Sequence, residues 1–175
     1  MLECQAAGPG RYLVTKFEEM CKAFTDARTY WFAYRDRSSA NLAILASEFL
    51  KYCDLPRGNV RYGTPGKELE GDMPIPAVVE FDPNTGYWQV NIYVTLYEAP
   101  NIYPHHQTRF RLALCESDNK TLVKLGWEKK PREIDVTDKG QRDEFYADIV
   151  VHFKQFFDRR PQVQEVKGNL GFTLD

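Results

Sequence analysis

The chain has 175 residues, of which 43% are hydrophobic and 27% charged, a balance typical of one soluble globular domain and not of a disordered chain. Its formal net charge of −2 argues against a protein whose main task is to coat nucleic acid, because that affinity comes from Lys and Arg neutralising phosphates. No apolar run is long enough to span a bilayer and no secretory signal is visible, so we expect a cytoplasmic protein without a membrane segment.

The N-terminal part, residues 11–53, predicts helices after a flexible arm over residues 1–10, which contains two glycines and a proline. Apolar residues then recur at steps of three and four, which is typical of one helix face. These residues are Leu13, Phe17, Met20, Cys21 and Phe24. Residues 27–35 fit either an extension of this helix or a short strand, and we favour the helix.

A second helix is expected after Ser38 or Ser39, because either hydroxyl can cap a first helical turn. Its buried stripe is Leu42, Leu45, Ala46, Phe49 and Cys53. Prolines and glycines then punctuate residues 54–76, which predicts a long connection without regular structure.

Residues 77–136 predict an antiparallel sheet. The expected strands cover residues 77–82, 87–97, 107–115 and 121–127, with the turn 83–86 between the first two. In the second and third strands apolar and polar residues alternate, so one face of the sheet should pack against a core. The apolar set is Trp88, Val90, Ile92, Val94, Leu96, Phe110, Leu112 and Leu114.

Residues 137–160 predict a C-terminal helix with Phe145, Ile149 and Phe153 on one face, and residues 161–175 form a tail that either adds an edge strand or hangs free. Together the elements predict one α+β domain. It has N-terminal helices, a central antiparallel meander of four or five strands, and a C-terminal helix packed on the apolar sheet face.

Four cysteines, Cys4, Cys21, Cys53 and Cys115, lie too far apart in sequence for a zinc or dithiol motif. In the expected reducing compartment they are most simply small buried hydrophobes. The sequence therefore predicts no metal site and no cofactor.

His105 and His106 adjoin the third strand, and successive strand residues point to opposite faces. We therefore expect His106 on the side of Phe110, and His105 on the side of Arg109 and Arg111, so that both cannot bind one metal ion. His106 and Thr108 also match one H-x-T motif of the two-histidine phosphoesterases, a family that needs two such motifs. A small hydrolase acting on a phosphate-containing substrate, with His106, Thr108 and Arg109 as its catalytic residues, remains an alternative.

The second face of the predicted sheet carries polar and aromatic residues that form a candidate binding surface. Its members are Asn91, Tyr93, Tyr97, Arg109 and Arg111, with His105 at the rim. Tyr and Arg are enriched at binding hot spots, although polar residues can equally well just solvate an open sheet face. No catalytic constellation is complete, so we expect a non-catalytic binding or adaptor protein. Its partner is another protein or a second copy of the chain, and single-stranded nucleic acid is a weaker alternative.

Overall fold

The computed structural model describes residues 15–97, 106–117, 120–158 and 172–173 of the chain. The chain divides into two compact units, residues 1–35 and residues 36–175. Helix α1 (Lys16–Tyr52) contributes its residues 16–35 to the first unit and its remaining turns to the second. The predicted arm over residues 1–10 and most of the predicted tail lie outside the described residues.

The described part of the first unit is helical. A capping box begins the helix: the Thr15 amide donates to a Glu18 carboxylate oxygen at 2.6 Å, and the Glu18 amide donates to the Thr15 hydroxyl at 3.2 Å. Residues 27–35 are helical, which confirms the favoured assignment for this stretch.

The prediction of two separate helices in the N-terminal part was wrong, because α1 continues through Ser38 and Ser39. Both serines are buried in the helix interior, at 0% and 9% exposure, and neither caps a helix start. No glycine or proline occurs between residues 16 and 52, so nothing in this stretch forces the helix to end.

The second unit is built on a seven-stranded sheet with the strand order β1-β3-β4-β5-β6, in which these five strands pair antiparallel as a meander. β2 adds to β3, and β7 pairs in parallel with β4. The strands are β1 (Val60–Gly63), β2 (Glu80–Asp82), β3 (Tyr87–Leu96), β4 (His106–Ser117), β5 (Lys120–Leu125), β6 (Arg132–Glu133) and β7 (Phe172–Thr173). The further helices are η1 (Arg57–Asn59), α2 (Ile75–Val78) and α3 (Lys139–Asp158).

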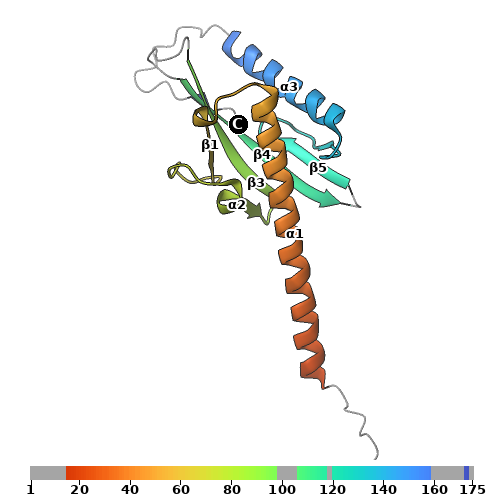
Figure 1. Cartoon of the computed structure of the whole chain (residues 1–175). Coiled ribbons are helices and arrows are strands. Elements are labelled where there is room, and N and C mark those ends of the chain that lie inside the picture. The colour runs from red at the N-terminus through yellow and green to blue at the C-terminus, as the bar shows by residue number, and fades with distance from the viewer. Residues whose placement is uncertain (1–14, 98–105, 118–119, 159–171, 174–175) are drawn as a thin grey trace, which may run out of the picture. The chain divides into compact units, whose positions relative to one another are not determined.

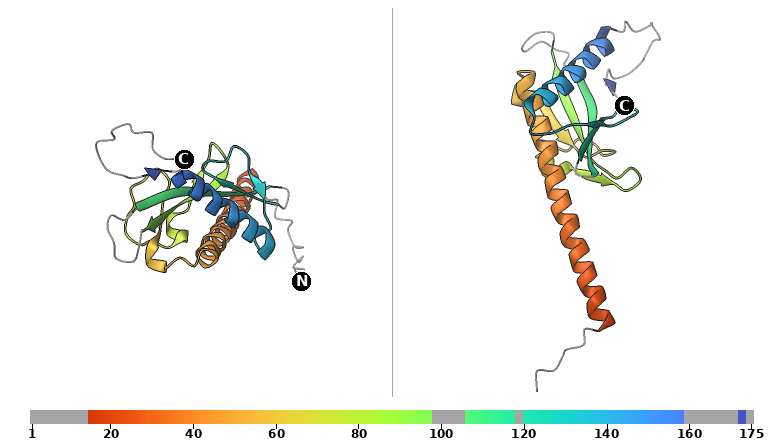
Figure 2. Two further views of the ribbon diagram at one scale, coloured as in Figure 1. Left: turned by 90° about the horizontal axis from the view of Figure 1, so that it is seen from above. Right: turned by 90° about the vertical axis from the view of Figure 1, so that its right-hand side faces the viewer.

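Helix α3 and the last turns of α1 cover one face of this sheet, as the predicted α+β architecture requires (Figures 1 and 2). Phe110 of β4 lies in the centre of the core, with its ring centroid 5.7 Å from Phe49 of α1 and 5.6 Å from Phe153 of α3. The two helices are also joined directly, because the buried Tyr146 hydroxyl donates to the Leu45 carbonyl at 2.9 Å. The core is therefore one layer of aromatic and aliphatic side chains between sheet and helices.

The predicted irregular connection 54–76 contains ordered elements that the sequence did not reveal. β1 pairs with β3 at the edge of the sheet, and η1 precedes it. β1 has only four residues, too few for a clear alternation of apolar and polar side chains. The first predicted strand is also shorter than expected, because residues 75–78 form α2. Pro76 near the start of α2 already has the helical φ and needs no amide partner there.

None of the helices in the described ranges is both long and apolar enough to cross a membrane.

Candidate functional site

The pairing of β3 with β4 sorts their side chains into two layers without a bulge from Trp88 to Leu114. Tyr93 pairs with Arg109 and Asn91 with Arg111, so these four share one face. His106 pairs with Leu96, and Thr108 with Val94, on the other face, which packs toward the helices. The predicted period of two is confirmed, including the side assigned to His106.

The polar face is the sheet surface away from the helices, and the structure shows that its centre is not open. Gln89, Asn91 and Tyr93 are only 7%, 1% and 8% exposed. The chain around β1 covers Tyr93, because a Cβ placed on Gly63 would lie 2.9 Å from the Tyr93 ring and 3.3 Å from the Leu69 side chain. An open sheet surface was therefore the wrong expectation for Asn91 and Tyr93. The polar face comprises Arg61, Gln89, Asn91, Tyr93, Thr95, Arg109 and Arg111.

Arginines occupy the accessible part of the polar face. Arg61 and Arg109 flank Tyr93 in register, and Arg61 is exposed while Arg109 is half-buried. Next to this row, the Nε of Arg111 and the Nδ2 of Asn91 are buried, and neither has a hydrogen-bond partner within the described ranges of the chain. Two neighbouring buried donors that lack an acceptor are unusual inside a protein.

A pocket of about 330 Å³ adjoins Arg111 at the β2 end of the polar face. Its wall carries acidic groups as well, Glu80 and Asp82. Asp82 accepts hydrogen bonds from the Thr85 hydroxyl, the Asn84 amide and Gln89, and these bonds lower the pKa of its carboxyl. The face is thus basic near Arg61 and acidic near Asp82, so it would favour a partner with charges of both signs.

The remaining predicted members of this surface lie at its edge or outside the described residues. Tyr97 is 38% exposed, and its hydroxyl donates to the Asn59 side chain of η1, which in turn donates to the Thr95 carbonyl at 3.2 Å. Tyr97 is therefore held at the β1 edge of the sheet. His105 lies outside the described residues.

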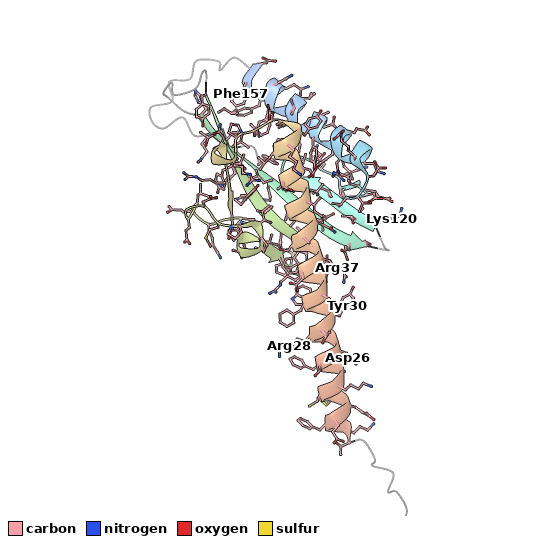
Figure 3. The ribbon with its side chains drawn as sticks, viewed as in Figure 1. Asp26, Arg28, Tyr30, Arg37, Lys120 and Phe157 are labelled. Atoms are coloured by element: carbon pink, nitrogen blue, oxygen red, sulfur yellow. The ribbon has the colours of Figure 1, made fainter. Side chains whose placement is uncertain are left out.

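A second site, the helix-side pocket, lies between the sheet and the ends of α1 and α3, with a volume of about 460 Å³. Most of its lining is apolar. Its apolar and thiol-bearing members include Phe49, Cys53, Leu55, Val94, Leu96, Phe153 and Phe157. Lys154 and Asp158, both exposed on α3, supply charged groups to the lining, and Figure 3 labels Phe157 near the end of that helix. This volume lies within the range of about 300–1,000 Å³ that is usual for small-molecule sites.

Thr108 is the polar residue that β4 contributes to the helix-side pocket. The residue is 1% exposed, and its hydroxyl has no hydrogen-bond partner among the residues that the structure describes. A buried hydroxyl without a partner costs free energy, because it has lost its water without replacement. An apolar pocket with a single unpaired hydroxyl in its wall is the arrangement expected for an apolar ligand with one hydrogen-bonding group.

The described cysteines, Cys21, Cys53 and Cys115, are free thiols, and they are less buried than the sequence predicted. Cys21 is exposed because it lies in the first unit, and Cys53 and Cys115 are half-buried. Burial raises the pKa of the Cys53 thiol to about 11 and also raises the pKa of Cys115. Cys53 lines the helix-side pocket as a protonated thiol, which is a poor nucleophile.

The proposed catalytic trio of the hydrolase alternative is divided by the sheet. His106 and Thr108 lie on the helix side, whereas Arg109 lies on the polar face, so Arg109 cannot contact an anion bound at the first two residues. Across the part of the chain that the structure describes, no group of three or more His, Cys, Asp or Glu side chains could hold a metal ion.

Sequence reasoning missed the helix-side pocket although it placed several of its walls. Alternation put Val94 and Leu96 on the apolar face of the sheet, and helical spacing put Phe153 on the packed face of the C-terminal helix. The sequence does not determine the distance between those faces, because that distance depends on how the ends of α1 and α3 cross the sheet. The unusual signal was Thr108 itself, a hydroxyl in an otherwise apolar layer.

Comparison with models of known protein families, with curated proteins and with solved structures finds no match. The functional conclusion therefore depends on the chemistry of the two sites.

Proposed function

We propose that the chain is a non-catalytic binding protein whose helix-side pocket takes an apolar small molecule with one hydrogen-bonding head group, such as a medium-chain fatty acid or alcohol. The observation that carries this proposal is the Thr108 hydroxyl, which is buried in an apolar wall and has no partner in the described part of the chain. A ligand head group would supply the missing hydrogen bond, and the hydrocarbon would gain burial against Phe49, Phe153 and Phe157. The cytoplasmic location expected from the composition belongs to the same proposal.

Thiol footprinting tests the pocket, because the chain provides its own control. In a variant with Cys4 and Cys115 replaced by serine, Cys53 in the pocket lining and the exposed Cys21 remain. We expect dodecanoic acid or dodecanol to slow the modification of Cys53 by a small uncharged thiol reagent, and to leave the rate at Cys21 unchanged. Equal rates at Cys53 with and without both compounds, at concentrations up to their solubility, would exclude this ligand class.

Head-group recognition is tested by Thr108→Val, which removes the hydroxyl and keeps a branched side chain of similar size. Wild-type protein should bind dodecanol more tightly than dodecane, measured by displacement of the fluorescent probe N-phenyl-1-naphthylamine. The variant should bind both equally, because only the alcohol can pair with the hydroxyl. If the variant still binds dodecanol more tightly than dodecane, Thr108 does not bind the head group.

A second candidate function, favoured by Arg111 and Arg61, is capture of a protein partner on the polar face. Arg111 lines the pocket at the β2 end of this face, where its guanidinium can pair with a carboxylate side chain of such a partner, and the exposed Arg61 adds a positive charge on the same face. Arg111→Gln and Arg61→Glu should each weaken binding to a peptide that alternates glutamate and lysine, while Lys22→Glu in the first unit should not. Binding that is unaffected by Arg111→Gln would argue against this surface.

Two other functions have less support. A hydrolase that uses His106 and Thr108 would have to work without Arg109 and should cleave generic phosphodiesters until His106 is replaced by alanine. Single-stranded nucleic acid binding should weaken steeply with salt, and a flat salt response would exclude it.

A further inference from the structure

Residues 16–35 of α1 present a row of large apolar side chains to solvent. Phe17, Met20 and Phe24 are 72%, 70% and 67% exposed. Figure 3 shows the side chains along this stretch and labels Asp26, Arg28 and Tyr30. Soluble proteins rarely expose contiguous apolar side chains of this size unless another surface covers them.

The spacing of the row is that of a coiled coil. Steps of three and four residues alternate without interruption, as at positions a and d of a heptad. The six positions are Phe17, Met20, Phe24, Ala27, Trp31 and Tyr34. Every one of them is apolar or aromatic, and a strict repeat of seven keeps the row facing the same neighbour over three successive heptads.

The charges beside this row permit a second copy of the chain as the neighbour. In a parallel pair, a residue at position g faces the residue five positions later in the other helix. Ala23 then faces Arg28, and Lys16 faces Cys21, so no like charges meet at these positions. The acidic residues Glu18, Glu19 and Asp26 fall at positions b and c, outside the contact.

We propose that residues 16–35 of α1 pair in register with the same residues of a second copy as a parallel two-stranded coiled coil. The parallel arrangement is favoured because it packs the most exposed side chains of the row, Phe17, Met20 and Phe24, against their own equivalents. The assembly is a symmetric dimer, the commonest form of homo-oligomer. This interaction is independent of the helix-side pocket, whose lining residues all lie in the second unit.

The mass of the full chain in solution, measured by analytical ultracentrifugation over a range of concentrations, tests the proposal. Wild-type protein should be a dimer, and Phe17→Lys combined with Phe24→Lys should raise the dissociation constant at least about tenfold. Thr25→Lys combined with Thr29→Lys adds the same charge to the same helix away from the row and should leave the dimer intact. Circular dichroism and the melting transition of the second unit, measured on the full chain, should be similar in both double variants.

The orientation has its own measurement. Met20→Cys, in a background with Cys4 and Cys21 replaced by serine, should give a disulfide-linked dimer with oxidised glutathione, because d positions meet in a parallel coil. A wild-type chain that stays monomeric at about 100 μM, or a dimer unaffected by the two lysines at positions 17 and 24, would overturn the proposal. A dimer that forms no cross-link through residue 20 would overturn the parallel arrangement.

Discussion

Replacing Thr108 by valine should make the ligand-free protein more stable, although the substitution removes a polar group from the proposed binding site. Thr108 is 1% exposed, and its hydroxyl pairs with no group of the described residues. In the unfolded chain water solvates that hydroxyl, so folding loses its hydrogen bonds without replacement. Valine fills nearly the same space with a methyl group, which makes no hydrogen bonds to water and therefore loses none on burial.

The expected gain follows from the cost of a buried polar group without a partner, which is about 1–3 kcal/mol. Part of that cost is recovered when the side chain relaxes, so we expect Thr108→Val to raise the free energy of unfolding by about 1–2 kcal/mol. For a chain of this length, that corresponds to a rise of about 2–8 °C in the melting temperature.

Urea unfolding followed by circular dichroism measures the change, with Thr85→Val as the matched control. The Thr85 hydroxyl donates to the Asp82 carboxylate at 2.8 Å, so the same substitution there removes a hydrogen bond and should lower stability. A loss of stability for Thr108→Val as large as that for Thr85→Val would mean that the Thr108 hydroxyl has a partner in the folded protein. The proposed role of Thr108 in the pocket would then fail as well.

Three further predictions concern the core, the polar face and the thiols. Gly63→Ala places a Cβ 2.9 Å from the packed Tyr93 ring and should lower the free energy of unfolding in urea by about 1–3 kcal/mol. An unchanged free energy of unfolding would mean that this ring moves freely. Tyr146→Phe removes a 2.9 Å hydrogen bond between α3 and α1 and should cost about 1 kcal/mol, whereas an unchanged midpoint would show that this bond adds nothing. The pKa of about 11 leaves roughly one Cys53 thiol in a thousand as thiolate at pH 8. A thiol reagent should therefore modify the exposed Cys21 much faster than Cys53 at this pH. Equal rates of modification would contradict the burial of Cys53.

The fold class could be predicted because its signals are local. The alternation from Trp88 to Leu96 defines one strand by its own residues, and the spacing of Phe145, Ile149 and Phe153 defines a helix face in the same way. The break expected at Ser38 was wrong because the side chains suited to a helix cap also fit inside a helix when it packs closely on a sheet. Four-residue β1 was missed because its pairing with β3 contributes more to its conformation than its own pattern does.

The two sites show the same division. By itself the sequence determined which residues share a face: Tyr93 with Arg109, and His106 with Thr108, because side-chain direction along a strand depends only on the count of residues. Only the tertiary structure decided that Tyr93 is covered and that Thr108 lines a pocket, because burial depends on chain segments that lie far away in the sequence.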